Sequence, residues 1–156
     1  MNIFGKLDAA NIPTSPFFIE AGEYSAEVTK ATYKENREGQ KQLLIEYTIT
    51  NEESQFLDSK ATQFFTLVDP EMTSEKLELL PAEEKKRIRQ SLASLKRTLC
   101  GNDNNSSQQG LGVDINDLND DNWDPATLIG TKVDLAISNY GTNNQGVNIR
   151  WANIKD

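Results

Sequence analysis

The chain has 156 residues, with 16 basic and 24 acidic side chains, a net charge of −8, one cysteine and no histidine. This length suits a single domain, since most domains have about 100–200 residues. The lack of histidine excludes a Ser-His-Asp triad, a Cys-His pair and a histidine-ligated metal, and the single Cys100 excludes a disulfide framework. The sequence shows neither a secretory signal nor an apolar run long enough to span a membrane, so we expect a cytoplasmic protein without a membrane partner.

Five segments alternate apolar and polar residues, as is typical of half-buried β-strands. They are residues 22–31, 42–50, 56–68, 131–138 and 147–154. In the first strand Ala26 and Val28 share one face, and in the last strand Ile149 and Trp151 do. This alternation predicts that Tyr47 and Trp151 belong to the core.

A helix is predicted over residues 81–101, between the third and fourth strands. Pro81 suits the first turn, and Gly101 suits the position after the last turn. The predicted apolar stripe consists of Ile88, Leu92, Leu95 and Leu99. The basic run around Lys85 is expected to face solvent, with a DNA or protein contact as the alternative, and Cys100 is expected to be buried. A shorter helix is predicted in SEKLELL.

Between this helix and the fourth strand lies an acidic tract. Residues 102–124 contain six aspartates and no cation, whereas residues 81–101 carry a net charge of +4. The tract is rich in Asn, Ser, Gln and Gly, which predicts a solvated, flexible insert that Trp123 anchors to the domain. The alternative is an acidic segment that competes for a basic groove. No calcium loop is expected, because the fifth and twelfth positions counted from Asp114 are Leu118 and Pro125.

The order of strand, strand, strand, helix, strand, strand is that of the OB-fold, a five-stranded Greek-key barrel. We therefore expect an all-β fold with one main helix, an OB-fold-like barrel whose end the helix closes with its apolar stripe. The alternative is an open antiparallel sheet with one packed helix. In either case residues 22–156 would form one domain after an N-terminal arm of residues 1–21, with residues 102–124 as its insert.

An OB-fold that binds single strands uses the outer face of its second and third strands, rimmed by the first and last hairpin loops. Cations there contact phosphates, and aromatic rings stack on bases. The predicted nucleic-acid-binding residues are Tyr33, Lys34, Arg37, Lys41, Lys60, Phe64, Lys132, Tyr140 and Arg150. The rings of Phe64, Tyr33 and Tyr140 would be the stacking platforms. The alternatives are a second core layer for Phe64 and local packing for the two tyrosines.

Two stretches carry a family resemblance: GEYSAEVTKATYKENREGQKQLLIEYTIT and LIGTKVDLAISNYGTNNQGVNIRWANIK. They resemble a family of small bacteriophage proteins with a domain of unknown function, which read G-x-Y-x-A/V-x-V, then G-x-x-x-L-x-I/L-x-Y/F-x-I-T, and later L-I-G-K-x-V-x-V. That family is similar in layout to phage single-stranded DNA-binding proteins of OB type. The resemblance implies a role in phage DNA replication or recombination, a phage recombinase or polymerase as partner, and a homodimer.

Two functions follow from these patterns. The first is sequence-independent binding of single-stranded DNA, without cofactor or metal. The second is an acidic β-barrel that binds other proteins, or a virion component, without a DNA role. No enzyme is expected, because the acidic pairs Glu83–Glu84 and Asp120–Asp121 are adjacent in sequence rather than opposed across a cleft.

Overall fold

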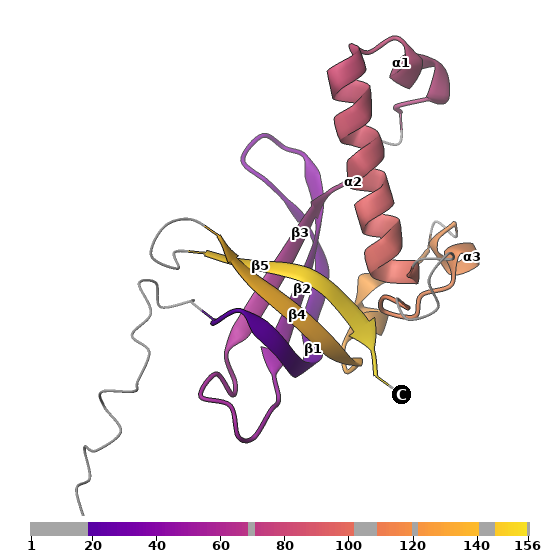
Figure 1. Ribbon diagram of the computed structural model, residues 1–156. Coiled ribbons are helices and arrows are strands. Elements are labelled where there is room, and N and C mark those ends of the chain that lie inside the picture. The colour runs from indigo at the N-terminus through magenta and orange to yellow at the C-terminus, as the bar shows by residue number, and fades with distance from the viewer. Residues whose placement is uncertain (1–18, 69–70, 102–108, 120–121, 141–145, 156) are drawn as a thin grey trace, which may run out of the picture.

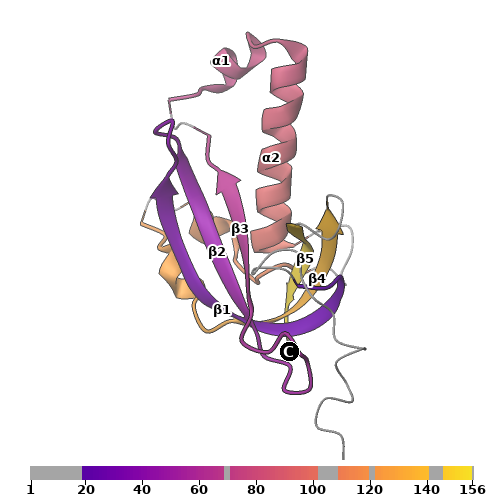
Figure 2. The same cartoon turned by 90° about the vertical axis from the view of Figure 1, so that its left-hand side faces the viewer.

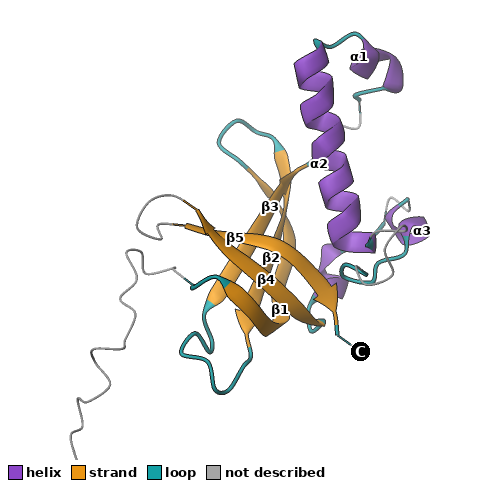
Figure 3. Cartoon of the chain, viewed as in Figure 1, coloured by secondary structure: helices purple, strands orange, loops and turns teal. Residues whose placement is uncertain are grey.

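The computed structural model describes residues 19–68, 71–101, 109–119, 122–140 and 146–155, without the side chains of residues 139, 140, 146 and 147. Its strands are β1 (Gly22–Glu35), β2 (Lys41–Ile49), β3 (Lys60–Thr66), β4 (Lys132–Tyr140) and β5 (Gly146–Ile154). Its helices are α1 (Ser74–Glu78), α2 (Ala82–Cys100) and α3 (Ile115–Leu118), followed by the 3₁₀ turn η2 (Pro125–Leu128). Figure 3 shows a body of strands with α2 as the main helix. The predicted class, all-β with one main helix, is confirmed.

All five strands form one antiparallel sheet in the order β3-β2-β1-β4-β5. The first residues of β1 pair with β4, and the rest of β1 pairs with β2. This shared central strand lets the sheet curl, so that β2 and β3 lie on one side and β4 and β5 on the other (Figures 1 and 2). Among the described residues no ladder joins β3 to β5, so the hydrogen-bonded sheet is open, as in the alternative prediction. The OB-fold-like assignment stays a prediction.

Two β-bulges decide which side chains face the core. In β1, Val28 pairs with Tyr47 and Lys30 with Glu46, which leaves Thr29 without a partner residue. In β5, Ile149 pairs with Ile137 and Trp151 with Ala136, which leaves Arg150 unpaired. Each extra residue shifts the alternation by one position, so residues beyond the bulge point to the opposite face from a simple two-residue period.

The core fills the concave side of the curled sheet. Its fully buried large side chains are Tyr47, Ile19, Leu43, Ile45, Ile49, Leu135, Val28 and Val133. The prediction that Tyr47 belongs to the core is confirmed. Trp151 is only half-buried and lies on the face of Ala136, not of Ile149, so its predicted core position is wrong because of the bulge at Arg150.

The hairpin turns explain why the strand ends differ from the prediction. Asn36 holds the first turn, since its Oδ1 accepts hydrogen bonds from the backbone N–H groups of Glu38 and Gln40. The ladder can therefore continue to Glu35 and Lys41, which makes β1 longer than expected. The third strand starts only at Lys60, because residues 54–59 fold into turns.

Helix α2 packs on the core only through its C-terminal end. Leu99 is 2% exposed and Leu95 is half-buried against the core, whereas Leu92 is 44% exposed. Figures 1 and 2 both show the N-terminal part of α2, with α1 at its tip, standing away from the sheet. The predicted apolar stripe therefore covers the core with its last turns alone. The predicted helix in SEKLELL is confirmed as α1.

Part of the acidic tract packs on the domain instead of being solvated throughout. Leu111 is buried, and Val113, Leu118 and Trp123 pack against the core. These apolar contacts hold the segment against the domain. The anchoring predicted for Trp123 is confirmed. The predicted arm up to residue 18, and residues 102–108 and 120–121 of the insert, lie outside the described residues. Within the described chain, none of the helices has the length and apolar character needed to cross a membrane.

Candidate nucleic-acid interface

The outer face of β1, β2 and β3, which we define as the side opposite the core, carries an exposed aromatic ring. Phe64 is 52% exposed, and the ammonium nitrogen of Lys34 lies 5.7 Å from the centroid of its ring. Lys34 reaches this face because the bulge at Thr29 turns the even-numbered residues of β1 outward. The predicted exposure of Phe64 is confirmed. A flat ring beside a cation is the arrangement that stacks a base and contacts its phosphate.

Leu44 supports this ring from below. It pairs with Phe64 on one side and with Thr32 on the other, which places it at the centre of the outer face. Although it lies on that face, Leu44 is only 9% exposed. Cross-strand neighbours cover one another in this way, so Phe64 and its neighbours shield Leu44 from water. The ring of Phe64 therefore packs on Leu44 and does not project freely into solvent.

The charges on the outer face are mixed. The register places Lys30, Lys34 and Lys60 on this face of the first three strands, together with Glu23, Glu27 and Glu46. Glu46 is the register partner of Lys30, lies 3.5 Å from the Nζ atom of Lys60 and accepts a hydrogen bond from the hydroxyl of Thr29. Lys34 is the cation that contacts the Phe64 ring.

Tyr33 and Lys41 form a second cation–aromatic pair on the opposite face of the same hairpin. Tyr33 pairs with buried Leu43, so it points to the core side, where it is 39% exposed. The Nζ atom of Lys41 lies 4.2 Å from the centroid of its ring. Burial and, to a lesser extent, the nearby carboxylate of Asp124 raise the pKa of the Tyr33 phenol. Asp124 belongs to the acidic tract, so this end of the tract lies beside one predicted DNA contact.

The remaining predicted contacts do not join these two pairs. Arg37 is exposed in the β1–β2 turn, and Lys132 lies at the start of β4, opposite Glu27. Arg150 is the bulged residue of β5 and lines a separate cavity with Arg97 and half-buried Trp151. Tyr140 ends β4, and its side chain lies outside the described residues. The predicted contacts are therefore spread over both faces of the sheet, and Lys132 lies on the outer face of β4, which β1 and β2 separate from Phe64 on β3.

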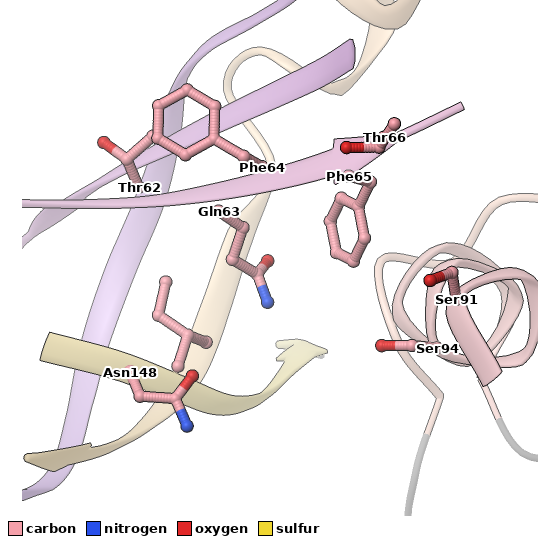
Figure 4. A pocket seen from close by; sticks show the side chains of 9 residues that line it. Thr62, Gln63, Phe64, Phe65, Thr66, Ser91, Ser94 and Asn148 are labelled. Atoms are coloured by element: carbon pink, nitrogen blue, oxygen red, sulfur yellow. The ribbon is translucent and has the colours of Figure 1, made fainter. Parts of the chain in front are cut away.

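A cavity of about 420 Å³ separates β3 from α2 and β5. Figure 4 shows Gln63 and Phe65 pointing from β3 toward this space, with Phe64 on the other side of the strand. Thr62, Phe64 and Thr66 of β3, Ser91 and Ser94 of α2, and Asn148 and Ile149 of β5 complete the walls. The cavity lies where β3 and β5 are not hydrogen-bonded to each other, and none of the described residues that line it is charged.

The sequence alone did not single out these cavity residues or Leu44. One signal was present, because Leu44 is an apolar residue at an outward position of an amphipathic strand. No signal identified Gln63 and Asn148, since isolated amides in strands are common and their meeting depends on the curl of the sheet.

Among the described residues, no group of three or more cysteine or acidic side chains could hold a metal ion. Comparison with known families finds no family that matches this chain, and no curated protein matches its sequence.

Proposed function

We propose that this protein binds single-stranded DNA through the outer face of β1, β2 and β3, as a non-enzymatic protein of phage type in DNA replication or recombination. The observation that carries the proposal is the pair of Phe64 and Lys34. A ring that is 52% exposed can stack on a base, and the lysine whose Nζ atom lies over it, 5.7 Å from its centroid, can contact the phosphate of that base.

The strand order also supports this proposal. The order β3-β2-β1-β4-β5, with a helix between β3 and β4, matches the sequence of elements in OB-folds. In that fold the second and third strands carry the ligand, and here they carry Leu44 and Phe64. Phage origin, the recombinase or polymerase partner and a homodimer belong to the same proposal and derive from the sequence resemblance.

Two lysine variants test where the phosphates bind. Lys34 lies beside Phe64, whereas Lys132 lies on β4 away from it, and both are exposed. Fluorescence anisotropy with labelled oligo-dT, repeated at several salt concentrations, gives the affinity and its salt dependence. We expect Lys34→Ala to weaken binding and to reduce the slope of log K against log salt by about 0.7, the value for one phosphate of a single strand. Lys132→Ala should change neither quantity.

Equal effects of the two lysine variants would reject the location of the site. Absence of binding at micromolar protein and low salt, or an affinity that salt does not change, would reject DNA binding itself. The purified wild-type protein serves as the reference in each titration.

A second function, protein binding, is favoured by one observation. Leu79 at the end of α1 is 86% exposed and Leu92 of α2 is 44% exposed. α1 and the N-terminal part of α2 stand away from the sheet (Figure 1). Exposed leucines on a projecting helix suit a protein contact better than a DNA contact. A mobility-shift assay separates the two functions, since a protein-binding module without a DNA role would not retard oligo-dT.

A further inference from the structure

We infer that the cavity between β3, α2 and β5 receives one base of the bound strand and favours thymine over cytosine. This inference rests on the proposed function, because the base enters from a strand held at Phe64. It adds a base-reading site to a surface that otherwise contacts any sequence.

Phe64 lines the edge of the cavity, and its ring points to the opposite side of the edge strand β3 from Gln63 and Phe65 (Figure 4). Successive residues of a β-strand point to opposite faces, so Gln63 and Phe65 enter the cavity while Phe64 faces outward (Figure 4). β3 ends the hydrogen-bonded sheet, so among the described residues no further strand pairs with its free edge. A single strand stacked on Phe64 can therefore pass the edge of β3 and place its next base in the cavity.

The walls suit a flat, uncharged group. Phe65 and Ile149 provide apolar surface, and Ser91, Ser94 and Asn148 provide polar groups at the rim. None of the described residues that line the space is a lysine, an arginine or an acidic residue, so these walls offer a phosphate no counter-charge. The volume of about 420 Å³ lies within the usual range for small-ligand sites, roughly 300–1,000 Å³.

Gln63 offers free N–H donors at the cavity. Its Oε1 accepts a hydrogen bond of 2.7 Å from the hydroxyl of Tyr47, a residue with 0% exposure. The buried tyrosine thus fixes the amide, and in the described chain the amide nitrogen of Gln63 has no partner of its own. A side-chain amide has one acceptor oxygen and two N–H donors, so the donors remain for a ligand.

The free N–H donors of Gln63 distinguish thymine from cytosine. Thymine presents a carbonyl oxygen at the position where cytosine presents an amino group. The free N–H donors of Gln63 pair with the carbonyl of thymine and cannot pair with the amino group of cytosine. Thymine and cytosine have the same ring size, so stacking on Phe64 should differ little between them.

The test compares oligo-dT with oligo-dC of equal length by anisotropy, for the wild type and four variants. For the wild type we expect tighter binding of dT, by about two- to tenfold, the worth of one hydrogen bond. Gln63→Leu should bring the ratio of the two affinities close to one. Tyr47→Phe should do the same, because the released amide can rotate and offer its oxygen. Gln63→Glu should reverse the preference, since a carboxylate accepts from the amino group of cytosine.

Phe64→Ala is the matched control, and it should weaken both oligonucleotides by the same factor. Circular dichroism verifies that each variant is folded, and the side-chain amide signals of Gln63 in an NMR spectrum should shift on addition of oligo-dT. Equal wild-type affinities, or a dT preference that Gln63→Leu and Tyr47→Phe leave unchanged, would overturn the inference while DNA binding stands. If neither oligonucleotide binds, the proposed function itself fails.

Discussion

Replacing Phe64 by alanine should separate DNA binding from folding. Fully burying a phenylalanine stabilises a protein by about 1.5–3 kcal/mol, and Phe64 is 52% exposed, so its burial contributes about 1 kcal/mol. An exposed cation–π contact such as that with Lys34 adds about 0.5–1 kcal/mol. We therefore expect Phe64→Ala to lower the free energy of unfolding by about 1–2 kcal/mol, which a folded domain tolerates.

The expected loss of DNA-binding free energy is a larger fraction of the total free energy of binding than the loss of stability is of the free energy of unfolding. Stacking of one base on an aromatic ring is worth about 1–3 kcal/mol, which corresponds to a decrease in affinity of about 5- to 150-fold. Anisotropy titrations with labelled oligo-dT at one fixed salt concentration measure the affinity, and urea unfolding measures the stability.

Two control variants make this experiment decisive. Leu57→Ala removes another large apolar side chain, 39% exposed in the β2–β3 turn, and should leave the affinity unchanged. Tyr33→Ala removes the aromatic ring on the opposite face of the hairpin and reports whether that face contributes. If Phe64→Ala binds as the wild type does while Tyr33→Ala loses affinity, the strand binds on the core side of the hairpin and our choice of face is wrong.

Two further predictions concern stability. A Cβ atom at Gly110 would lie 2.5 Å from the carbonyl oxygen of Thr98 at a φ of +58°, so Gly110→Ala should cost about 3 kcal/mol or more in urea unfolding. Gly39→Ala, at a φ of +79° with no atom within 4 Å, should cost only about 1 kcal/mol, and equal costs would contradict the packing around Gly110. Burial raises the pKa of Tyr47 far above the value of about 10 that it has in the unfolded chain. The unfolded state therefore loses its proton first, and stability should fall above pH 10 by up to about 1.4 kcal/mol per pH unit for this residue. Tyr47→Phe should therefore lose less stability than the wild type between pH 9 and pH 11. Equal losses of unfolding free energy in the two proteins over this range would refute the prediction.

The patterns in the sequence predicted the elements well where local chemistry is strong. Pro81 and Gly101 flank α2 as expected, because one suits a helix start and the other adopts the positive φ that follows a helix. The alternation in β2 placed Leu43, Ile45, Tyr47 and Ile49 in the core, since that strand contains no bulge. Trp123 was correctly predicted to anchor the acidic tract, because a large apolar ring in a polar segment is favourable where it packs against the core.

The candidate site was predicted only in part. Phe64 and Lys34 do lie together, but Tyr33 lies on the other face, and Lys132 and Arg150 lie elsewhere. The choice of residue types was sound, since cations and rings are what a single strand requires. Which of these residues lie together was not predicted correctly, because this depends on the strand register, and residue types alone do not show the register.

The sequence by itself determined the order of the strands and the main helix, the ends of that helix and the core positions of β2, because these follow from periodicity and from the backbone preferences of proline and glycine. Only the tertiary structure decided which face each ring and cation occupies. The bulges at Thr29 and Arg150 move every later side chain to the opposite face, and a bulge is defined only when two strands are paired. Likewise, Gln63 and Asn148 line one cavity only because the sheet curls until β3 and β5 lie on either side of it.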